Sequence, residues 1–65
     1  MSQSQQQIEA EFAAYTVENA KFNAGNAAAG TRARKHLGEM AKAIKARRTE
    51  ISAEKAARAE AKKAA

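Results

Sequence analysis

Two runs of side chains at helical spacing, separated by a Gly-Asn pair, constrain the fold of this chain more than any other feature. The first run steps by four and three residues through Ile8, Phe12, Tyr15, Asn19 and Phe22. The second steps by three and four through Leu37, Met40, Ile44, Arg47 and Ile51. Such steps place residues on one side of an α-helix and are typical of coiled-coil seams. The sequence therefore predicts two helices, each with a seam.

The residues outside these runs also favour helices. The 65 residues include no proline, and alanine, glutamate, lysine, arginine and glutamine dominate. Strand signals are absent, because β-branched residues are rare and nothing alternates. We expect an all-α protein with one helix at about residues 4–23 and a longer second helix from about residue 27.

The link between the helices can be placed in two ways. Gly25 suits the position after a helix and Asn26 suits an N-cap, which puts the turn at about residues 24–26. Gly30 with Thr31 as the N-cap follows the same logic, and the sequence leaves both open. A short link favours an antiparallel helical hairpin.

The expected hairpin covers residues 1–51, and an Ala/Lys-rich tail covers residues 52–65. The tail has no bulky apolar residue, so we expect it to be either a projecting helix or disordered. A single hairpin would leave Phe12, Tyr15 and Phe22 largely exposed. Without cysteines, a chain this short needs another way to bury apolar surface.

We therefore expect a homodimer or higher homo-oligomer, packed as a four-helix bundle, in which Asn19 fixes the register. The expected core and dimer contacts are Ile8, Phe12, Tyr15, Asn19, Phe22, Leu37, Met40, Ile44 and Ile51. Arg47 would extend along the bundle edge.

Charge divides the chain into two unlike parts. Residues 1–24 carry a net charge of −2 and residues 25–65 a net charge of +7. On a helical projection, most cations of the second helix form a stripe beside its seam, whereas Glu39 and Glu50 fall elsewhere. Such sorting by sign suits a polyanion. The candidate contacts are Arg32, Arg34, Lys35, Lys42, Lys45, Arg47, Arg48 and Lys55.

The residue types of the stripe indicate which polyanion it suits. The basic segment has no aromatic residue on which single-stranded bases could stack. It also has few neutral hydrogen-bonding side chains for reading base edges. We expect duplex DNA held through its phosphates, with counterion release as the driving force. Duplex RNA is also recognised through its backbone, so a small RNA-binding hairpin regulator stays open. A phage or ribosome-associated structural protein stays open as well.

Other classes of function find little support. The stretch "GNAAAG" lacks the Gly-Lys-Ser/Thr ending of a phosphate loop. We expect His36 to be an exposed side chain paired with Glu39, and Glu54 to pair with Arg58. Since paired carboxylates, a nucleophile–base set and metal-ligand spacings are missing, we expect no enzyme, no cofactor and no metal. No apolar run approaches the roughly 18 residues of a membrane span, and the start lacks a secretory signal, so we expect a soluble cytoplasmic protein without membrane contacts.

Residues 18–65 resemble the Hc-type, linker-histone-like nucleoid proteins of chlamydiae and other bacteria. The shared features are Gly25-Asn26, Arg32-Ala33-Arg34, Leu37, Ile44, and the segment from Glu50 to Lys55. The resemblance implies DNA binding and compaction with weak sequence preference, and a place in the nucleoid. The tail departs from the pattern, because it is short and contains Glu60.

Overall fold

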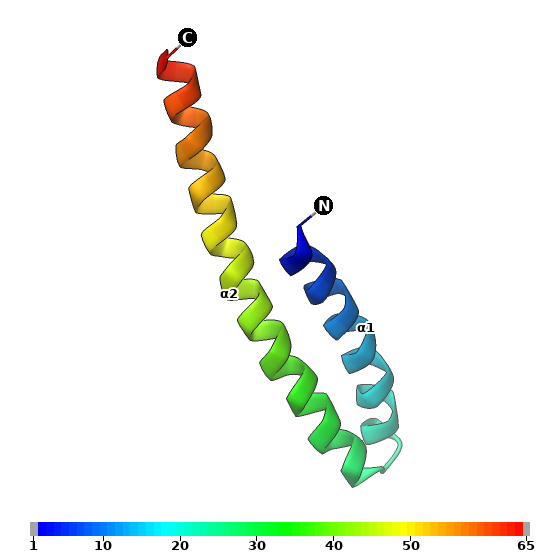
Figure 1. Ribbon diagram of the computed structural model, residues 1–65. Coiled ribbons are helices and arrows are strands. Elements are labelled where there is room, and N and C mark those ends of the chain that lie inside the picture. The colour runs from blue at the N-terminus through cyan, green and yellow to red at the C-terminus, as the bar shows by residue number, and fades with distance from the viewer. Residues whose placement is uncertain (1, 65) are drawn as a thin grey trace.

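The computed structural model describes residues 2–64, which form two α-helices in an antiparallel hairpin (Figure 1). Helix α1 spans Gln3–Asn23 and helix α2 spans Ala27–Ala64. α1 lies along the first part of α2, and α2 continues alone beyond the start of α1 (Figure 1). The molecule is therefore a rod of 59 × 15 × 14 Å. The predicted all-α hairpin with a longer second helix is confirmed.

Capping residues set the ends of α1 and the start of α2. The Ser2 hydroxyl accepts a hydrogen bond of 3.0 Å from the Gln5 N–H at the start of α1. At its end, Gly25 has a φ of 108°, and the N–H groups of Gly25 and Asn26 donate to the carbonyls of Phe22 and Lys21. These two bonds form a Schellman motif, which requires a left-handed residue.

The Asn26 side chain then caps α2 by accepting a hydrogen bond from the Ala29 N–H at 3.1 Å. Of the two turns that the sequence leaves open, the structure has the one at Gly25-Asn26. Gly30 and Thr31 lie inside α2.

The helices meet through small residues. The buried apolar residues among those described are Ala29, Ala33 and Ala43, with exposed fractions of 0%, 7% and 3%. Next to them, Gly30 lies under the Phe22 ring, so closely that a Cβ at Gly30 would be 2.6 Å from Cδ1 of Phe22. Alanine and glycine allow the two backbones to approach each other closely.

Most bulky side chains of the two runs lie beside this contact and not within it. Phe12 is 59% exposed and Phe22 51%, while Leu37, Ile44 and Ile51 are each about 44% exposed. Leu37, Ile44 and Ile51 of the second run therefore lie beside the contact between the helices, whereas Met40 of the same run is half-buried. The contact falls on the neighbouring row of alanines, because large side chains there would hold the helices apart.

Polar pairs across the two helices fix their register. Hydrogen bonds join Ser4 to Glu50 (2.5 Å), Arg32 to Glu18 (2.8 Å), and His36 to Glu11 (2.8 Å). The pairs lie near the start, the end and the middle of α1, so they hold it along its whole length. Within residues 2–64, neither helix is long and apolar enough to cross a membrane.

Candidate nucleic-acid interface

All eight predicted cationic contacts lie on α2, which is one uninterrupted helix. The side of α2 turned away from α1, here called the outer face, carries Arg34, Ala41, Lys45, Arg48 and Ser52, all exposed. These residues are separated by seven, four, three and four positions, so they share one side of the helix. A partner can reach this face without moving α1.

Three of the eight cations are paired with carboxylates. Nε of Arg32 lies 2.8 Å from Glu18, Nζ of Lys42 lies 3.5 Å from Glu39, and a guanidinium nitrogen of Arg47 lies 3.1 Å from Glu50. Their charge is largely cancelled locally. These three predicted contacts therefore differ from the other five, because each already has a carboxylate partner.

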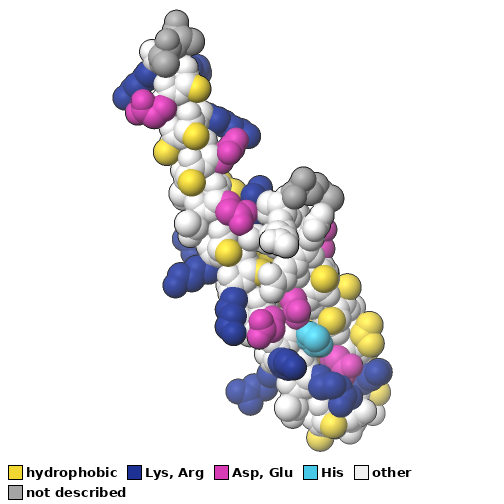
Figure 2. Space-filling view, in the orientation of Figure 1, with side chains coloured by type: hydrophobic (Ala, Val, Ile, Leu, Met, Phe, Trp, Pro, Cys, Tyr) yellow, Lys and Arg dark blue, Asp and Glu magenta, His cyan; other side chains and the backbone are white. Residues whose placement is uncertain are grey.

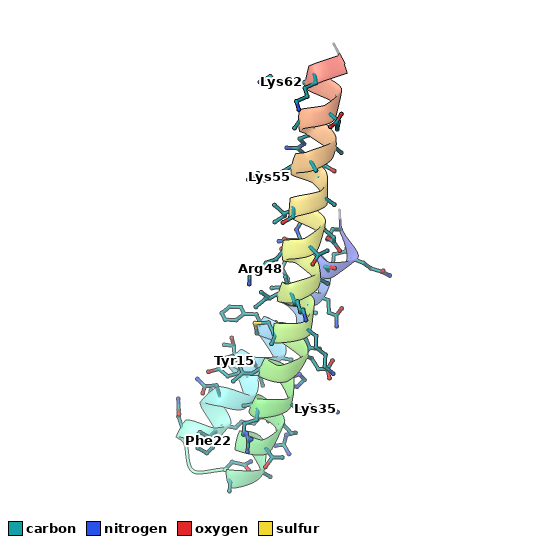
Figure 3. The ribbon with its side chains drawn as sticks, turned by 90° about the vertical axis from the view of Figure 1, so that its left-hand side faces the viewer. Tyr15, Phe22, Lys35, Arg48, Lys55 and Lys62 are labelled. Carbon is teal, nitrogen blue, oxygen red and sulfur yellow. The ribbon has the colours of Figure 1, made fainter. Side chains whose placement is uncertain are left out.

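The other five predicted cations form no ion pair with any residue between 2 and 64. They are Arg34, Lys35, Lys45, Arg48 and Lys55, and each is exposed. Arg48 and Lys55 point to one side of α2, and Lys35 points to the other (Figure 3). The predicted stripe is thus wider than one line of side chains, with Arg34, Lys45 and Arg48 near its middle.

Carboxylates gather on a different side of the hairpin. Figure 2 shows acidic and basic side chains interleaved around the imidazole of His36. The hydrogen bond from Arg32 is the main cause of the lowered pKa of Glu18. Hydrogen bonds from Ser4 and Arg47 likewise lower the pKa of Glu50. These acids stay ionised beside their own partners and leave the outer face without a carboxylate.

His36 does not pair with Glu39, which corrects the sequence-based expectation. Its Nδ1 lies 2.8 Å from Glu11 of α1, and the two side chains are 28% and 22% exposed. Glu39 pairs with Lys42 instead. A helical hairpin places residues at similar distances from its turn opposite each other, so the turn position could have indicated the cross-helix pair.

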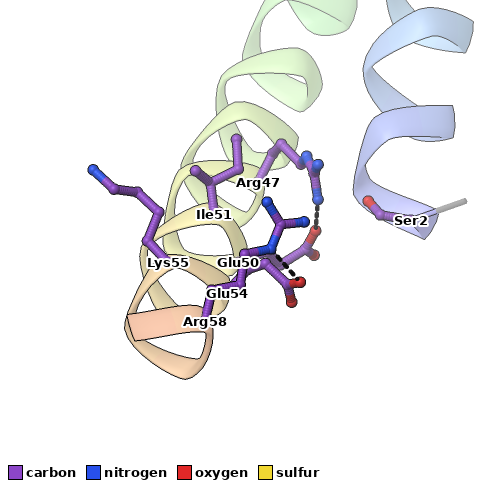
Figure 4. A pocket seen from close by; sticks show the side chains of 7 residues that line it. All are labelled: Ser2, Arg47, Glu50, Ile51, Glu54, Lys55 and Arg58. Carbon is purple, nitrogen blue, oxygen red and sulfur yellow. Dashed lines mark hydrogen bonds and ion pairs between the residues drawn. The ribbon is translucent and has the colours of Figure 1, made fainter. Parts of the chain in front are cut away.

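The start of α1 leaves an open hollow against α2. Arg47 pairs there with Glu50, and Arg58 pairs with Glu54 at 3.1 Å, which confirms the predicted pair (Figure 4). Lys55 points away from both carboxylates (Figure 4). This hollow is therefore internally neutralised, and Lys55 belongs with the exposed cations.

An apolar face runs along one flank of the hairpin. Near the turn, it forms a groove of about 350 Å³ in which Tyr15, Asn19, Phe22 and Leu37 take part, with Arg34 at its edge. Ile44 and Ile51 continue the row of Leu37 at steps of seven residues, and Phe12 lies seven residues before Asn19 on α1. Within the hairpin alone, this face stays open to solvent.

The family model of the histone H1-like protein Hc1 matches residues 2–57. The chain belongs to this family. The match covers both helices of the hairpin, so it includes α1, and it stops within the tail. No curated protein and no solved structure matches the chain.

The histone H1-like description of the family indicates a DNA-binding, architectural class of protein. The family match and the unpaired cations on the outer face of α2 therefore both indicate a polyanionic ligand such as DNA.

Proposed function

We propose that this chain is an architectural protein of the nucleoid that binds duplex DNA through phosphates, with little sequence preference. One observation carries the proposal. Within residues 2–64, the carboxylates of Glu11, Glu18, Glu39, Glu50 and Glu54 each have a basic partner, whereas seven cations of α2, the five named above together with Lys62 and Lys63, have none. The excess positive charge of the chain is thus presented on one long helix.

The shape and side chains of that helix favour the duplex backbone over bases. The outer face is exposed, and its short side chains, such as Ala41 and Ser52, allow the phosphate backbone of a duplex to approach α2. No aromatic residue lies between positions 23 and 65, so base stacking has no platform. The proposed contacts are Arg34, Lys35, Lys45, Arg48 and Lys55; Arg32, Lys42 and Arg47 contribute less because they are paired.

Salt dependence is the direct test of this mechanism. If about five phosphates are neutralised, log K should fall against log salt with a slope of about −4 to −5. The affinity is measured by fluorescence anisotropy with duplexes of two unrelated sequences, duplex RNA and single-stranded DNA. Nearly equal affinity for the two DNA duplexes and weaker single-strand binding are expected. An affinity insensitive to salt contradicts the proposal.

A matched pair of charge variants tests the proposed surface. The triple variant Arg34→Gln/Lys45→Gln/Arg48→Gln removes three unpaired cations. The control Lys21→Gln/Lys42→Gln/Arg58→Gln removes the same charge from exposed cations that are paired with Glu18, Glu39 and Glu54. The first variant should lose about three units of salt slope, and the second clearly less. Equal losses would mean that only net charge matters.

We also propose that a second copy of the chain covers the apolar face. The hairpin buries only alanines among its described apolar residues, whereas Phe12, Phe22, Leu37, Ile44 and Ile51 are each about half exposed. A core of that size rarely stabilises a chain of 65 residues. Sedimentation equilibrium at micromolar concentration should give a dimer or larger species, and a well-folded monomer would remove this part of the proposal.

A further inference from the structure

Four residues of α2 line a shallow hollow of about 280 Å³ on the outer face. They are Lys45, Arg48, Thr49 and Ser52. Their spacing of three, four and seven residues from Lys45 places them on one side of the helix, over two turns. The hollow combines two cations with two hydroxyl groups, and α1 contributes no side chain to it.

The two cations of the hollow are available to an external anion. Neither Lys45 nor Arg48 forms an ion pair with a residue between 2 and 64. The nearest glutamate in sequence, Glu50, is bound by Ser4 and Arg47 on the side facing α1. An anion in the hollow would therefore meet positive charge without a competing carboxylate.

The two hydroxyl groups differ in what they can donate. Thr49 Oγ1 donates to the carbonyl of Lys45 at 3.2 Å, so its proton is engaged within the helix. Ser52 lies one turn after Arg48, is exposed, and forms no side-chain hydrogen bond within residues 2–64. Ser52 thus brings a hydroxyl group that is free to donate a hydrogen bond next to two unpaired cations. Thr49 only lines the hollow, because its hydroxyl proton is already engaged.

We propose that this hollow is an anchoring subsite for one phosphodiester group of the duplex backbone. Lys45 and Arg48 pair with its non-bridging oxygens, and the Ser52 hydroxyl donates a hydrogen bond to one of them. Hydroxyl and cationic side chains are the usual phosphate contacts in DNA complexes, and such contacts fix the register of the protein on the duplex. This inference rests on the proposed function and assigns Ser52 a role that the charge pattern alone does not indicate.

Single hydroxyl deletions test the subsite. Ser52→Ala should weaken duplex DNA binding about two- to tenfold, the range expected for one hydrogen bond, with an unchanged salt slope because no charge is lost. Thr49→Ala, the matched control, should bind within twofold of the original chain. Alanine is the better helix former at both positions, so circular dichroism should show no loss of helix that could explain weaker binding.

A double-mutant cycle shows whether Ser52 and Arg48 share one phosphate. Each single substitution is expected to lower the affinity for duplex DNA by some factor. The double variant Ser52→Ala/Arg48→Gln should lose less affinity than the product of its two single factors, because both residues contact one phosphate. The double variant Ser52→Ala/Arg34→Gln should lose the full product, because those two residues act independently. If the original chain binds duplex DNA with the expected salt slope but Ser52→Ala binds equally well, the subsite is wrong and the proposed function stands. If the original chain does not bind duplex DNA, the proposed function itself is wrong. Equal coupling of Ser52 to Arg34 and Arg48 would also overturn the subsite.

Discussion

Gly30 and Gly38 both lie inside α2 but have opposite surroundings. A Cβ at Gly30 would be 2.6 Å from Cδ1 of Phe22, whereas a Cβ at Gly38 would meet nothing within 4 Å. Alanine is favoured over glycine in a helix by about 1 kcal/mol. Gly38→Ala should therefore stabilise the protein by about that amount, and Gly30→Ala should not, because the Phe22 ring must leave its place against α2. Thermal unfolding followed by circular dichroism compares the variants, and equal stabilisation by both would contradict the packing of Phe22.

Two carboxyl groups give the stability an acid dependence. Arg32 lowers the pKa of Glu18, and Ser4 and Arg47 lower the pKa of Glu50, both from an ordinary value of 4.5. A group with a lower pKa in the folded state binds fewer protons there. Its contribution to stability is complete above pH 4.5 and is lost as the pH falls through the folded-state pKa. The stability supplied by these two pairs should therefore be present at neutral pH and disappear on acidification below about pH 4.5.

The acid dependence is measured by comparing unfolding midpoints at neutral pH and at about pH 3. The double variant Glu18→Gln/Glu50→Gln should be less stable than the original chain at neutral pH and approach it in stability at the lower pH. Glu9, which forms no ion pair within residues 2–64, provides the control Glu9→Gln. A double variant that differs from the original chain equally at both pH values would show that these pairs do not carry the dependence.

At the scale of the helices, the contact depends on small side chains. Ala43 is 3% exposed, and Ala46, one turn further along α2, is exposed. Ala43→Leu should destabilise the hairpin by about 1–3 kcal/mol, because the larger side chain forces the helices apart. Ala46→Leu should be nearly neutral. Urea unfolding gives both values, and a stabilised Ala43→Leu variant would mean that the helices have room to repack.

Local chemistry determines the helices and their turn, which is why both could be predicted from the sequence. The Gly25 and Asn26 caps act on neighbouring backbone groups, and helix propensity acts residue by residue. The contact between the helices could not be predicted in the same way. Leu37 and Ala33 belong to adjacent rows of α2, and helical spacing fits both rows equally well.

Which of these two rows of α2 contacts α1 depends on residues of α1 that are distant in sequence. The Phe22 ring packs on Gly30, and the hydrogen bonds between His36 and Glu11 and from Ser4 to Glu50 span 25 and 46 residues. The same cross-helix pairing decides which cations of the predicted interface are neutralised. For example, Arg32 pairs with Glu18, 14 residues away, whereas Arg34 has no acid opposite it within the described residues. Charge spacing along α2 alone cannot show this difference.

At the scale of the whole molecule, the apolar face and the outer face lie next to each other on α2, with Arg34 at the border between them. Because Arg34 lies at the edge of the apolar groove, a second copy on the apolar face would approach Arg34 but would leave Lys45, on the outer face of each α2, exposed to solvent. Such a dimer presents two cationic surfaces and can hold two duplexes together, since a linked second site raises the effective affinity without any new contact. In the proposed dimer, bridging of two duplexes would therefore depend on the apolar face, whereas binding to one duplex would depend on the cations.

This dependence separates bridging from binding in one experiment. The double variant Phe12→Ser/Ile44→Ser reduces the apolar face, which should prevent association. On a short isolated duplex, the dependence of log K on log salt per chain should be unchanged. In a bridging assay, beads that carry one duplex should no longer retain a second, labelled duplex when this variant is added. Val17→Ser is the matched control, because Val17 is 54% exposed on α1 and lies outside the apolar face. Bridging that survives in the double variant while sedimentation shows a monomer would place both duplex contacts on a single chain, with the unpaired cations of α2 serving two duplexes at once.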